Sequence, residues 1–275
     1  MGWLADRLKV EKQLVLNGCF DALSARMVEA AGAEATYCSG FSICAAAFGL
    51  PDTGLLTATE MLGHFQRIRA VTSLPMLVDA DTGYGETQNV ERTIVNLAGI
   101  GVTACHIEDQ TFPKRCGHMD GKTVVDRVAA AERMETAIET GRRCGVDIIA
   151  RTDALATHGL GEAIERANIF IAQGAVAAFI DAPGCDEHLR SIIREVMGPI
   201  VFNAAPIGGY RAPAGLIAAF QIILHPIELL LHSFSALDGK LGLQVIAPHA
   251  EETAFDRIQH CLKRDRFEKY EECQA

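Results

Sequence analysis

The feature that most constrains this chain is an eightfold alternation of short apolar runs with amphipathic stretches. Near-continuous apolar runs are typical of parallel strands that are buried on both faces. Eight strand–helix units within 275 residues predict an α/β fold, a (β/α)8 TIM barrel that forms a single domain over residues 1–275. The expected strands cover residues 13–18, 35–40, 75–81, 104–109, 147–152, 177–182, 199–204 and 221–225.

A doubly wound sheet is the alternative architecture. It is less favoured because no GxGxxG motif follows the first expected strand. The capping pattern of Thr57 and Glu60 marks the start of one expected helix. The expected helices cover residues 3–10, 21–32, 57–73, 88–99, 126–144, 160–173, 187–196 and 213–220, with a C-terminal helical extension over about 226–275.

Composition excludes several classes of function. A net charge of -10 argues against a nucleic-acid binder, which needs a basic face, but it allows a small anionic substrate. Nine cysteines without a CxxC motif, and an N-terminus without an apolar signal region, predict a reducing cytoplasm. The apolar stretch 212–237 contains two prolines and a glutamate, so we expect no membrane span.

The C-terminal ends of the expected strands are polar or charged, whereas their starts are not. In a barrel these ends meet at one mouth, where catalytic groups are found. This asymmetry predicts an enzyme. The ends carry Asn17, Ser39, Asp79, Asp81, Glu108, Asp109, Arg151, Asp153, Asp181, Asn203 and His225.

Four of these groups are carboxylates on neighbouring strands: Asp79, Asp81, Glu108 and Asp109. Crowded carboxylates repel one another unless a cation neutralises them, and oxygen donors without paired His or Cys favour Mg²⁺ or Mn²⁺ over zinc. A metal site is therefore predicted. The alternative is helix capping, or ion pairing with Arg151 and Lys114.

Arg151 and Cys116 are the other chemical candidates. Arg151 can bind a carboxylate through two hydrogen bonds, or it can form a structural salt bridge in the barrel mouth. Cys116 lies in the loop PKRCGHMDGK, where neighbouring cations favour a thiol that exchanges protons near neutral pH; an ordinary loop cysteine is the alternative. Backbone amides of Ser39–Phe41 can bind a carboxylate, or form a plain turn.

Six motifs together are very specific: SGF at 39–41, GLPDTG at 49–54, LVDADTGYG at 77–85, HIEDQ at 106–110, PKRCGHM at 113–119 and ARTDA at 150–154. With them the chain resembles the isocitrate lyase/phosphoenolpyruvate mutase superfamily from about residue 14 to residue 225. The KRCGH segment is similar to the carbon–carbon lyase branch, which includes methylisocitrate lyase and 2,3-dimethylmalate lyase.

The resemblance implies site residues and an assembly. Mg²⁺ would be held by Asp79 and Asp81, with Glu108 as a further ligand, and the last helix would be swapped between subunits of a homotetramer, a dimer of dimers. The implied catalytic residues are Cys116 as general acid, Arg151, Glu108 and Asp52. The implied substrate-binding residues are Ser39, Gly40, Phe41, Gly117, His118, Arg151, Asp181 and Asn203.

The reaction implied by the resemblance is Mg²⁺-dependent cleavage of a substituted 2-hydroxy dicarboxylate, malate-like or methylisocitrate-like, into a 2-oxo acid and a carboxylic acid. Two alternatives stay open. One is a decarboxylase, or a phosphonopyruvate-type mutase or hydrolase, acting on a 2-oxo acid without Cys116. The other is a barrel that binds a 2-oxo acid and Mg²⁺ without turnover.

The chain departs from the lyase pattern on one side of the expected pocket. Asp181 stands where the lyases have glutamate, and Ala204-Ala205 stands where they have a polar run. Glu228 replaces a Ser or Thr, and Leu231 replaces the arginine of methylisocitrate lyase. A lost cation and an added anion suit a tricarboxylate poorly, so a smaller or less charged 2-hydroxy acid is expected.

Overall fold

The computed structural model of the protein describes residues 2–10, 12–117, 119–205 and 210–227. Eight parallel strands form one sheet in the order β6-β5-β4-β3-β2-β1-β8-β7, and a bridge between Ala178 and Ile200 joins the two outer strands. The predicted barrel is confirmed. The strands are β1 (Leu14–Cys19), β2 (Thr36–Cys38), β3 (Met76–Asp79), β4 (Ala104–Glu108), β5 (Asp147–Thr152), β6 (Ala177–Ile180), β7 (Val201–Asn203) and β8 (Ile222–His225).

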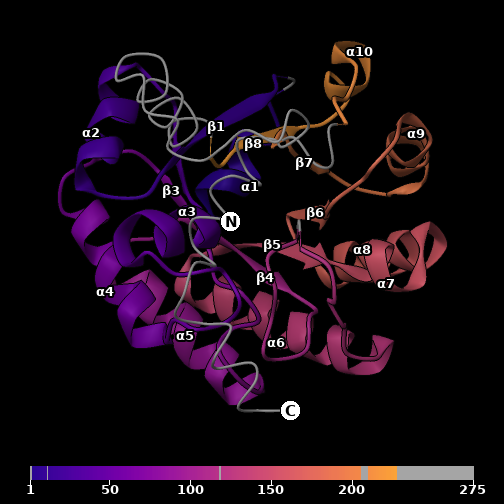
Figure 1. Ribbon diagram of the computed structural model, residues 1–275, viewed down its shortest axis with the longest axis horizontal. Helices are drawn as coiled ribbons and strands as arrows, with labels where there is room; N and C mark the ends of the chain where they lie inside the picture. The colour runs from indigo at the N-terminus through magenta and orange to yellow at the C-terminus, as the bar shows by residue number, and fades with distance from the viewer. Residues whose placement is uncertain (1, 11, 118, 206–209, 228–275) are drawn as a thin grey trace, which may run out of the picture.

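Helices surround the strands (Figure 1). The predicted capping box is present. The Thr57 side chain accepts a hydrogen bond from the Glu60 amide, and the Glu60 carboxylate accepts one from the Thr57 amide. The helices are α1 (Trp3–Arg7), α2 (Ala22–Ala30), α3 (Gly40–Ile43), the π-helix η1 (Cys44–Phe48), α4 (Ala58–Arg69), α5 (Thr87–Gly99), α6 (Arg127–Cys144), α7 (Ala154–His158), α8 (Leu160–Gln173), α9 (Asp186–Glu195) and α10 (Ala214–Ile217).

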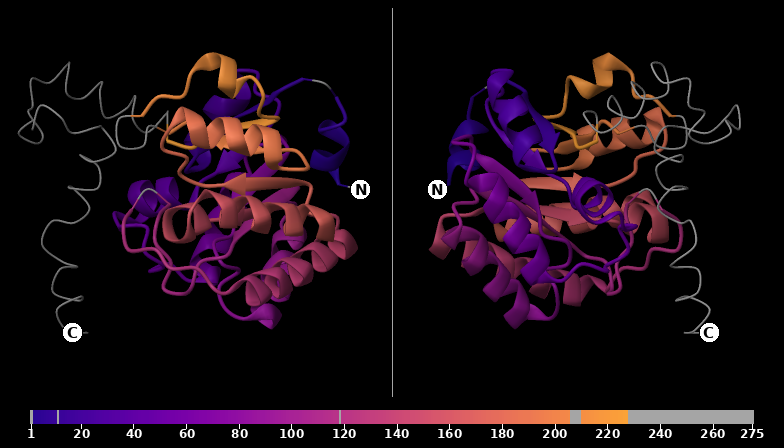
Figure 2. Two further views of the ribbon diagram at one scale, coloured as in Figure 1. Left: turned by 90° about the vertical axis from the view of Figure 1, so that its right-hand side faces the viewer. Right: turned by 60° about the vertical axis from the view of Figure 1, so that its left-hand side comes forward.

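Side chains fill the barrel interior near its N-terminal end. Leu14, Leu77 and Ile149 from three strands pack there with Leu4 of α1. The start of β5 fixes α1, because the Asp147 carboxylate accepts hydrogen bonds from two backbone amides of the N-terminal segment. The helix therefore lies at one end of the strands (Figure 2), and the opposite end is left for function.

Two segments were not expected to be helical. Residue 40 was expected to end a strand and residues 41–48 to belong to the connection before the helix at 57, but residues 40–48 form α3 and η1. Ser39 caps α3 by accepting a hydrogen bond from the Ser42 amide at 3.4 Å, and Gly49, with φ of 63°, ends η1. α7 directly follows β5. Both segments are short, so contacts with the barrel stabilise them more than helix propensity does.

The expected C-terminal helical extension lies almost wholly within residues 228–275, outside the described residues, and so does the predicted helix swap. The described segments form one barrel. Within them, no helix is long and apolar enough to cross a membrane.

Candidate active site

A pocket of about 410 Å³, including its part open to solvent, lies at the C-terminal ends of the strands. Most of the residues that sequence reasoning selected meet there, although they come from distant parts of the chain. The predicted residues that line it are Ser39, Phe41, Asp52, Asp79, Cys116, Gly117, Arg151, Asp181 and Asn203.

Asp79, at the end of β3, is held by backbone donors. Its Oδ1 accepts from the Asp81 amide at 3.0 Å, and its Oδ2 accepts from the Gly40 amide at 3.2 Å. A side chain at position 40 would not fit, because a Cβ on Gly40 would lie 2.9 Å from the Asp79 carboxylate. The close approach of α3 to β3 therefore explains the glycine in the SGF motif.

Lys114 lies among these carboxylates. Its Nζ is 2.5 Å from Asp52 Oδ1 and 2.6 Å from Asp81 Oδ1, and the lysine side chain is 3% exposed. We call Asp52, Asp79, Asp81 and Lys114 the acid side of the pocket. Sequence reasoning named Lys114 only as a salt-bridge alternative and as a neighbour of Cys116. Its place within the motif PKRCGHM, two residues before Cys116, was the available signal.

Asp79, which ends β3, and Asp81, two residues later, differ in acidity. Burial works to raise the pKa of Asp79, but His106 and the charges of Lys114 and Arg151 outweigh it and lower the pKa to about 2. Burial raises the pKa of Asp81 to about 7, and the neighbouring carboxylates add to the rise while Lys114 opposes it. The acid side thus carries more negative charge than its one lysine balances.

This charge excess fits a divalent cation. The donors are hard carboxylate oxygens of the kind that Mg²⁺ prefers. Glu108 Oε1 is buried without a hydrogen-bond partner among the described residues. In the same residues, however, no three His, Cys, Asp or Glu side chains are grouped closely enough to hold a metal ion, and the Lys114 ammonium contacts Asp81 instead. Asp79, Asp81 and Glu108 stay predicted ligands.

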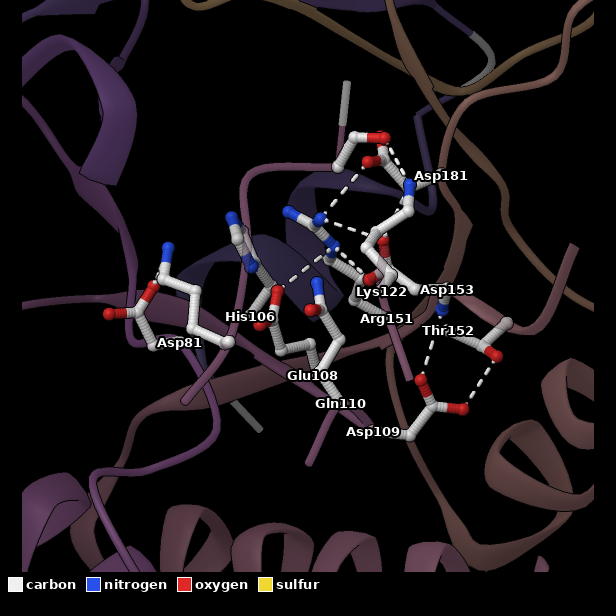
Figure 3. A network of polar contacts seen from close by, with 12 residues as sticks. Asp81, His106, Glu108, Asp109, Gln110, Lys122, Arg151, Thr152, Asp153 and Asp181 are labelled. Atoms are coloured by element: carbon white, nitrogen blue, oxygen red, sulfur yellow. Dashed lines mark hydrogen bonds and ion pairs between the residues drawn. The ribbon is translucent and has the colours of Figure 1, made fainter. Parts of the chain in front are cut away.

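Arg151 organises the opposite side. Its Nε and Nη2 bind the two carboxylate oxygens of Asp153 at 2.9 and 3.1 Å, and Nη2 also binds Asp181 Oδ2 at 3.0 Å (Figure 3). Glu108 Oε2 lies 3.3 Å from Nε. We call Arg151, Asp153, Asp181 and Lys122 the arginine side. The structural salt bridge that the sequence left open is therefore present.

Gly117 lies directly on this side. A Cβ at that position would stand 1.4 Å from Asp181 Oδ2 and 2.6 Å from Arg151 Nη2. The loop that carries Cys116 consequently approaches Asp181 and Arg151 with its backbone, and only glycine permits this approach.

Asp109 does not belong to the pocket, which corrects its placement in one acid cluster with Glu108. Its carboxylate accepts from Thr152 Oγ1 at 2.6 Å, from the Asp153 amide at 3.0 Å and from Arg166 Nη1 at 3.0 Å. Adjacent residues at a strand end point to opposite faces, so Glu108 and Asp109 diverge. Asp109 and Arg166 support the arginine side from behind.

Cys116 is 8% exposed and packs in an apolar group with Phe41, Ala205 and Ile227. Its amide donates to the Asp52 carbonyl at 2.9 Å, so the loop is attached to the acid side. Asn203, at the end of β7, accepts from the Ala205 amide at 3.0 Å. His118, Glu228 and Leu231 lie outside the described residues.

Known proteins share this architecture. A probable 2-methylisocitrate lyase of Corynebacterium glutamicum is 36% identical over 94% of this chain and 84% of its own. The crystal structure of a 2,3-dimethylmalate lyase matches with a TM-score of 0.81 and 31% identity over 99% of this chain and 94% of that one. A phosphonopyruvate hydrolase solved with oxalate and Mg²⁺ shares the fold, with a TM-score of 0.72 and 23% identity over 94% and 93%.

The expected relationship to lyases is confirmed by these names. Residues 4–222 match the phosphoenolpyruvate phosphomutase family. The chain therefore belongs to that family, within the phosphoenolpyruvate mutase/isocitrate lyase superfamily that its six motifs predict.

Proposed function

We propose that the protein is a Mg²⁺-dependent carbon–carbon lyase that cleaves an alkyl-substituted, malate-like 2-hydroxy acid into a 2-oxo acid and a carboxylic acid. One observation carries the proposal. A single pocket is lined by Asp79 of the acid side, Arg151 of the arginine side and the Cys116 thiol. A chelating group, a carboxylate-binding group and a proton donor are the three functions that this cleavage requires.

The 2-oxo acid half of the substrate would lie between the two sides. Asp79 and Asp81, with Glu108, would hold Mg²⁺, which when bound would stabilise negative charge on the oxygen at C2. Arg151 would bind the adjacent carboxylate. Its bonds to Asp153 and Asp181 use Nε and Nη2, so Nη1 is the candidate donor to the substrate. The backbone of Ser39–Phe41 completes this end.

The chain's own groups then move two protons. Asp52 lines the pocket beside Lys114 and is the candidate acceptor of the hydroxyl proton. The bond between the two substrate halves breaks, and the leaving half becomes an enolate-like carboxylate. Cys116 donates a proton to its carbon. A largely buried thiol suits this step, because bulk water is kept from the reactive carbanion.

The apolar group around Cys116 supports an alkyl substituent on the leaving half. Phe41, Ala205 and Ile227 pack beside the thiol. Ala205 falls in the segment where the lyase pattern has polar residues. An apolar wall stabilises a methyl group and provides no partner for a third carboxylate, whose burial without a partner is costly. A malate with an alkyl group on C3, such as 2,3-dimethylmalate, therefore fits better than a tricarboxylate.

Turnover of a 2-alkylmalate panel by wild type, Cys116→Ala and Cys116→Ser tests the proposal, with Mg²⁺ present and Cys144→Ser as the matched control. Loss of the general acid should lower kcat by about 10²–10⁴-fold. Full turnover by both variants would contradict the role of Cys116. Undiminished pyruvate release from oxaloacetate or phosphonopyruvate by Cys116→Ala would favour the alternative reaction.

We also propose that the protein works in the cytoplasm as a homotetramer, with neither nucleic acid nor membrane as a partner. The net charge of -10 supports the absence of a nucleic-acid partner, and nine cysteines without a CxxC motif support a reducing compartment. Light scattering in solution measures the subunit number.

A further inference from the structure

Lys122 is a buried cation that the proposed reaction does not use. Its side chain is 4% exposed, and its Nζ lies 3.4 Å from Asp153 Oδ1 and donates a hydrogen bond to the Gly117 carbonyl. Figure 3 shows Lys122 reaching toward Asp153 beside Arg151. A buried ammonium is costly unless it is paired and hydrogen-bonded, so these two contacts decide where this lysine lies.

The two contacts connect separate parts of the pocket. Gly117 directly follows Cys116 in the loop, whereas Asp153 follows β5 and holds Arg151 through two hydrogen bonds. The Asp153 end is fixed, because its amide donates to Asp109 at 3.0 Å and Asp109 is paired with Arg166. Lys122 therefore connects the loop at Gly117 to a fixed carboxylate.

The first part of the same loop has its own attachments. The Gln110 side chain exchanges two hydrogen bonds with the backbone of Arg115, at 2.9 and 2.8 Å. The Cys116 amide donates to the Asp52 carbonyl at 2.9 Å. These bonds fix the chain as far as the Cys116 nitrogen and toward the acid side. After Cys116, the Met119 amide donates to the Cys116 carbonyl at 2.8 Å within the loop, and Lys122 adds an attachment that is directed toward the arginine side.

We propose that Lys122 is a positioning residue whose ammonium holds the Gly117 carbonyl against Asp153 and thereby fixes the Cys116 thiol relative to Arg151. The inference rests on the proposed function, because it assumes that Cys116 is the proton donor. Lys122 does not line the pocket, and the hydrogen bonds of Arg151 to Asp153 and Asp181 do not involve it. The expected effect is on kcat and not on KM.

A purely structural lysine would behave differently. If Lys122 served only to balance the charge of Asp153, its replacement would lower Tm and leave the access of reagents to Cys116 unchanged. The reactivity of the Cys116 thiol separates the two cases, because it reports the position of the loop and needs no turnover.

The experiment uses Lys122→Met, Lys122→Gln and Lys122→Arg in the full chain, with Lys9→Met as the control. Lys9 is a surface lysine with a side chain that is 61% exposed and paired with Asp6. Iodoacetamide is added to each protein, and modification of Cys116 is followed by peptide mass spectrometry. Turnover of 2,3-dimethylmalate and Tm are measured in parallel.

Lys122→Met should raise the alkylation rate of Cys116 by about tenfold, the change expected when a charged hydrogen bond no longer opposes local opening. It should lower kcat on the order of 10²-fold, as a small displacement of a reacting group does. Lys122→Arg keeps a cation and should recover part of both, and Lys9→Met should match wild type.

An unchanged alkylation rate in Lys122→Met and Lys122→Gln would overturn the inference, whatever happens to Tm. If Lys122→Met does not fold, Lys122→Gln, which keeps a hydrogen-bond donor of similar length, gives the same readout. If wild type turns over no substrate on the panel, the proposed function fails, and the alkylation rates still decide whether Lys122 positions Cys116.

Discussion

The two sides of the pocket differ in how their charges are balanced. On the acid side, the single ammonium of Lys114 pairs with two carboxylates, Asp52 and Asp81, and a third, Asp79, accepts from the Asp81 amide. On the arginine side, Arg151 and Lys122 match Asp153 and Asp181 one for one. With its three carboxylates ionised, the acid side is short of two positive charges, which is the charge of Mg²⁺, whereas on the arginine side only Glu108, 3.3 Å from Arg151 Nε, is additional to the matched pairs.

The two sides also differ in what supports them. Backbone amides hold the acid side, through the bonds from Gly40 and Asp81 to Asp79. The arginine side rests on a second layer of ions, because Asp109 holds Asp153 and is itself paired with Arg166. We infer that the acid side is built to accept a cation, and that the arginine side is built to stay rigid. The following predictions test this difference.

The largest expected effect comes from removing the support of the arginine side. Arg166 is 2% exposed and pairs with the fully buried Asp109 at 3.0 Å. Arg166→Met would leave that carboxylate without its cation and lower the free energy of unfolding by about 3–5 kcal/mol. Urea denaturation measures the loss.

The matched control is Arg194→Met, because the Arg194 side chain is 68% exposed and should contribute little. Adding Asp109→Asn to Arg166→Met removes the stranded charge and should restore part of the stability. Equal stability of Arg166→Met and Arg194→Met would show that the second layer contributes nothing, and the proposed rigidity of the arginine side would lose its basis.

The sequence predicted the strands of this fold closely. Seven of the eight expected runs contain an observed strand, and β1 extends one residue beyond the run 13–18. Strands buried on both faces have an apolar continuity that few other segments share. The short helices α3 and α7 were missed, since contacts with the barrel decide their formation and local propensity does not.

The site was predictable in its residue types and less so in its connections. Strand-end polarity and the six motifs identified Asp79, Arg151 and Cys116, all of which line the pocket. Which partner each cation takes depends on side-chain direction. The alternation of side chains along a strand could have separated Asp109 from Glu108. Nothing in the spacing of Lys122 indicates that its ammonium reaches Asp153, because that contact depends on the path of a loop.

On the acid side, Asp81→Asn should affect activity and spare stability. The substitution removes a predicted metal ligand and one charge from a crowded group, so kcat/KM should fall on the order of 10²–10³-fold. Burial and the neighbouring carboxylates raise the pKa of Asp81 to about 7, so the negative charge is not what stabilises the fold. The free energy of unfolding without metal should therefore stay the same or rise.

Steady-state kinetics measures the loss of activity, and the rise of Tm with added Mg²⁺ measures the loss of metal binding. Glu135→Gln, on the exposed face of α6, is the control. A variant that keeps its turnover and its Mg²⁺ response would exclude Asp81 from the metal site. A large loss of stability would erase the contrast with Arg166→Met, since both sides would then be structural.

The smallest expected effect lies at the outer end of the arginine side, where Glu162 binds Arg166 at 2.7 Å and also pairs with Arg127. The Arg127 hydrogen bond is the main cause that lowers the pKa of Glu162 to about 2. A carboxyl group whose pKa is lowered by folding stabilises the fold at pH values above its unfolded pKa, near 4.5. This stability is lost as the pH falls toward 2. Solvent screening limits the contribution to about 1 kcal/mol.

Glu162→Gln should therefore be less stable than wild type at pH 7, and the two should converge as the pH falls from about 5 toward 2. Unfolding free energies across that range provide the measurement, and a constant difference would assign the effect to packing instead of charge. If kcat at pH 7 is unchanged while stability falls, the ionic layer behind Arg151 ends functionally at Arg166; a matching fall in kcat would mean that the rigidity of the arginine side extends to the protein surface.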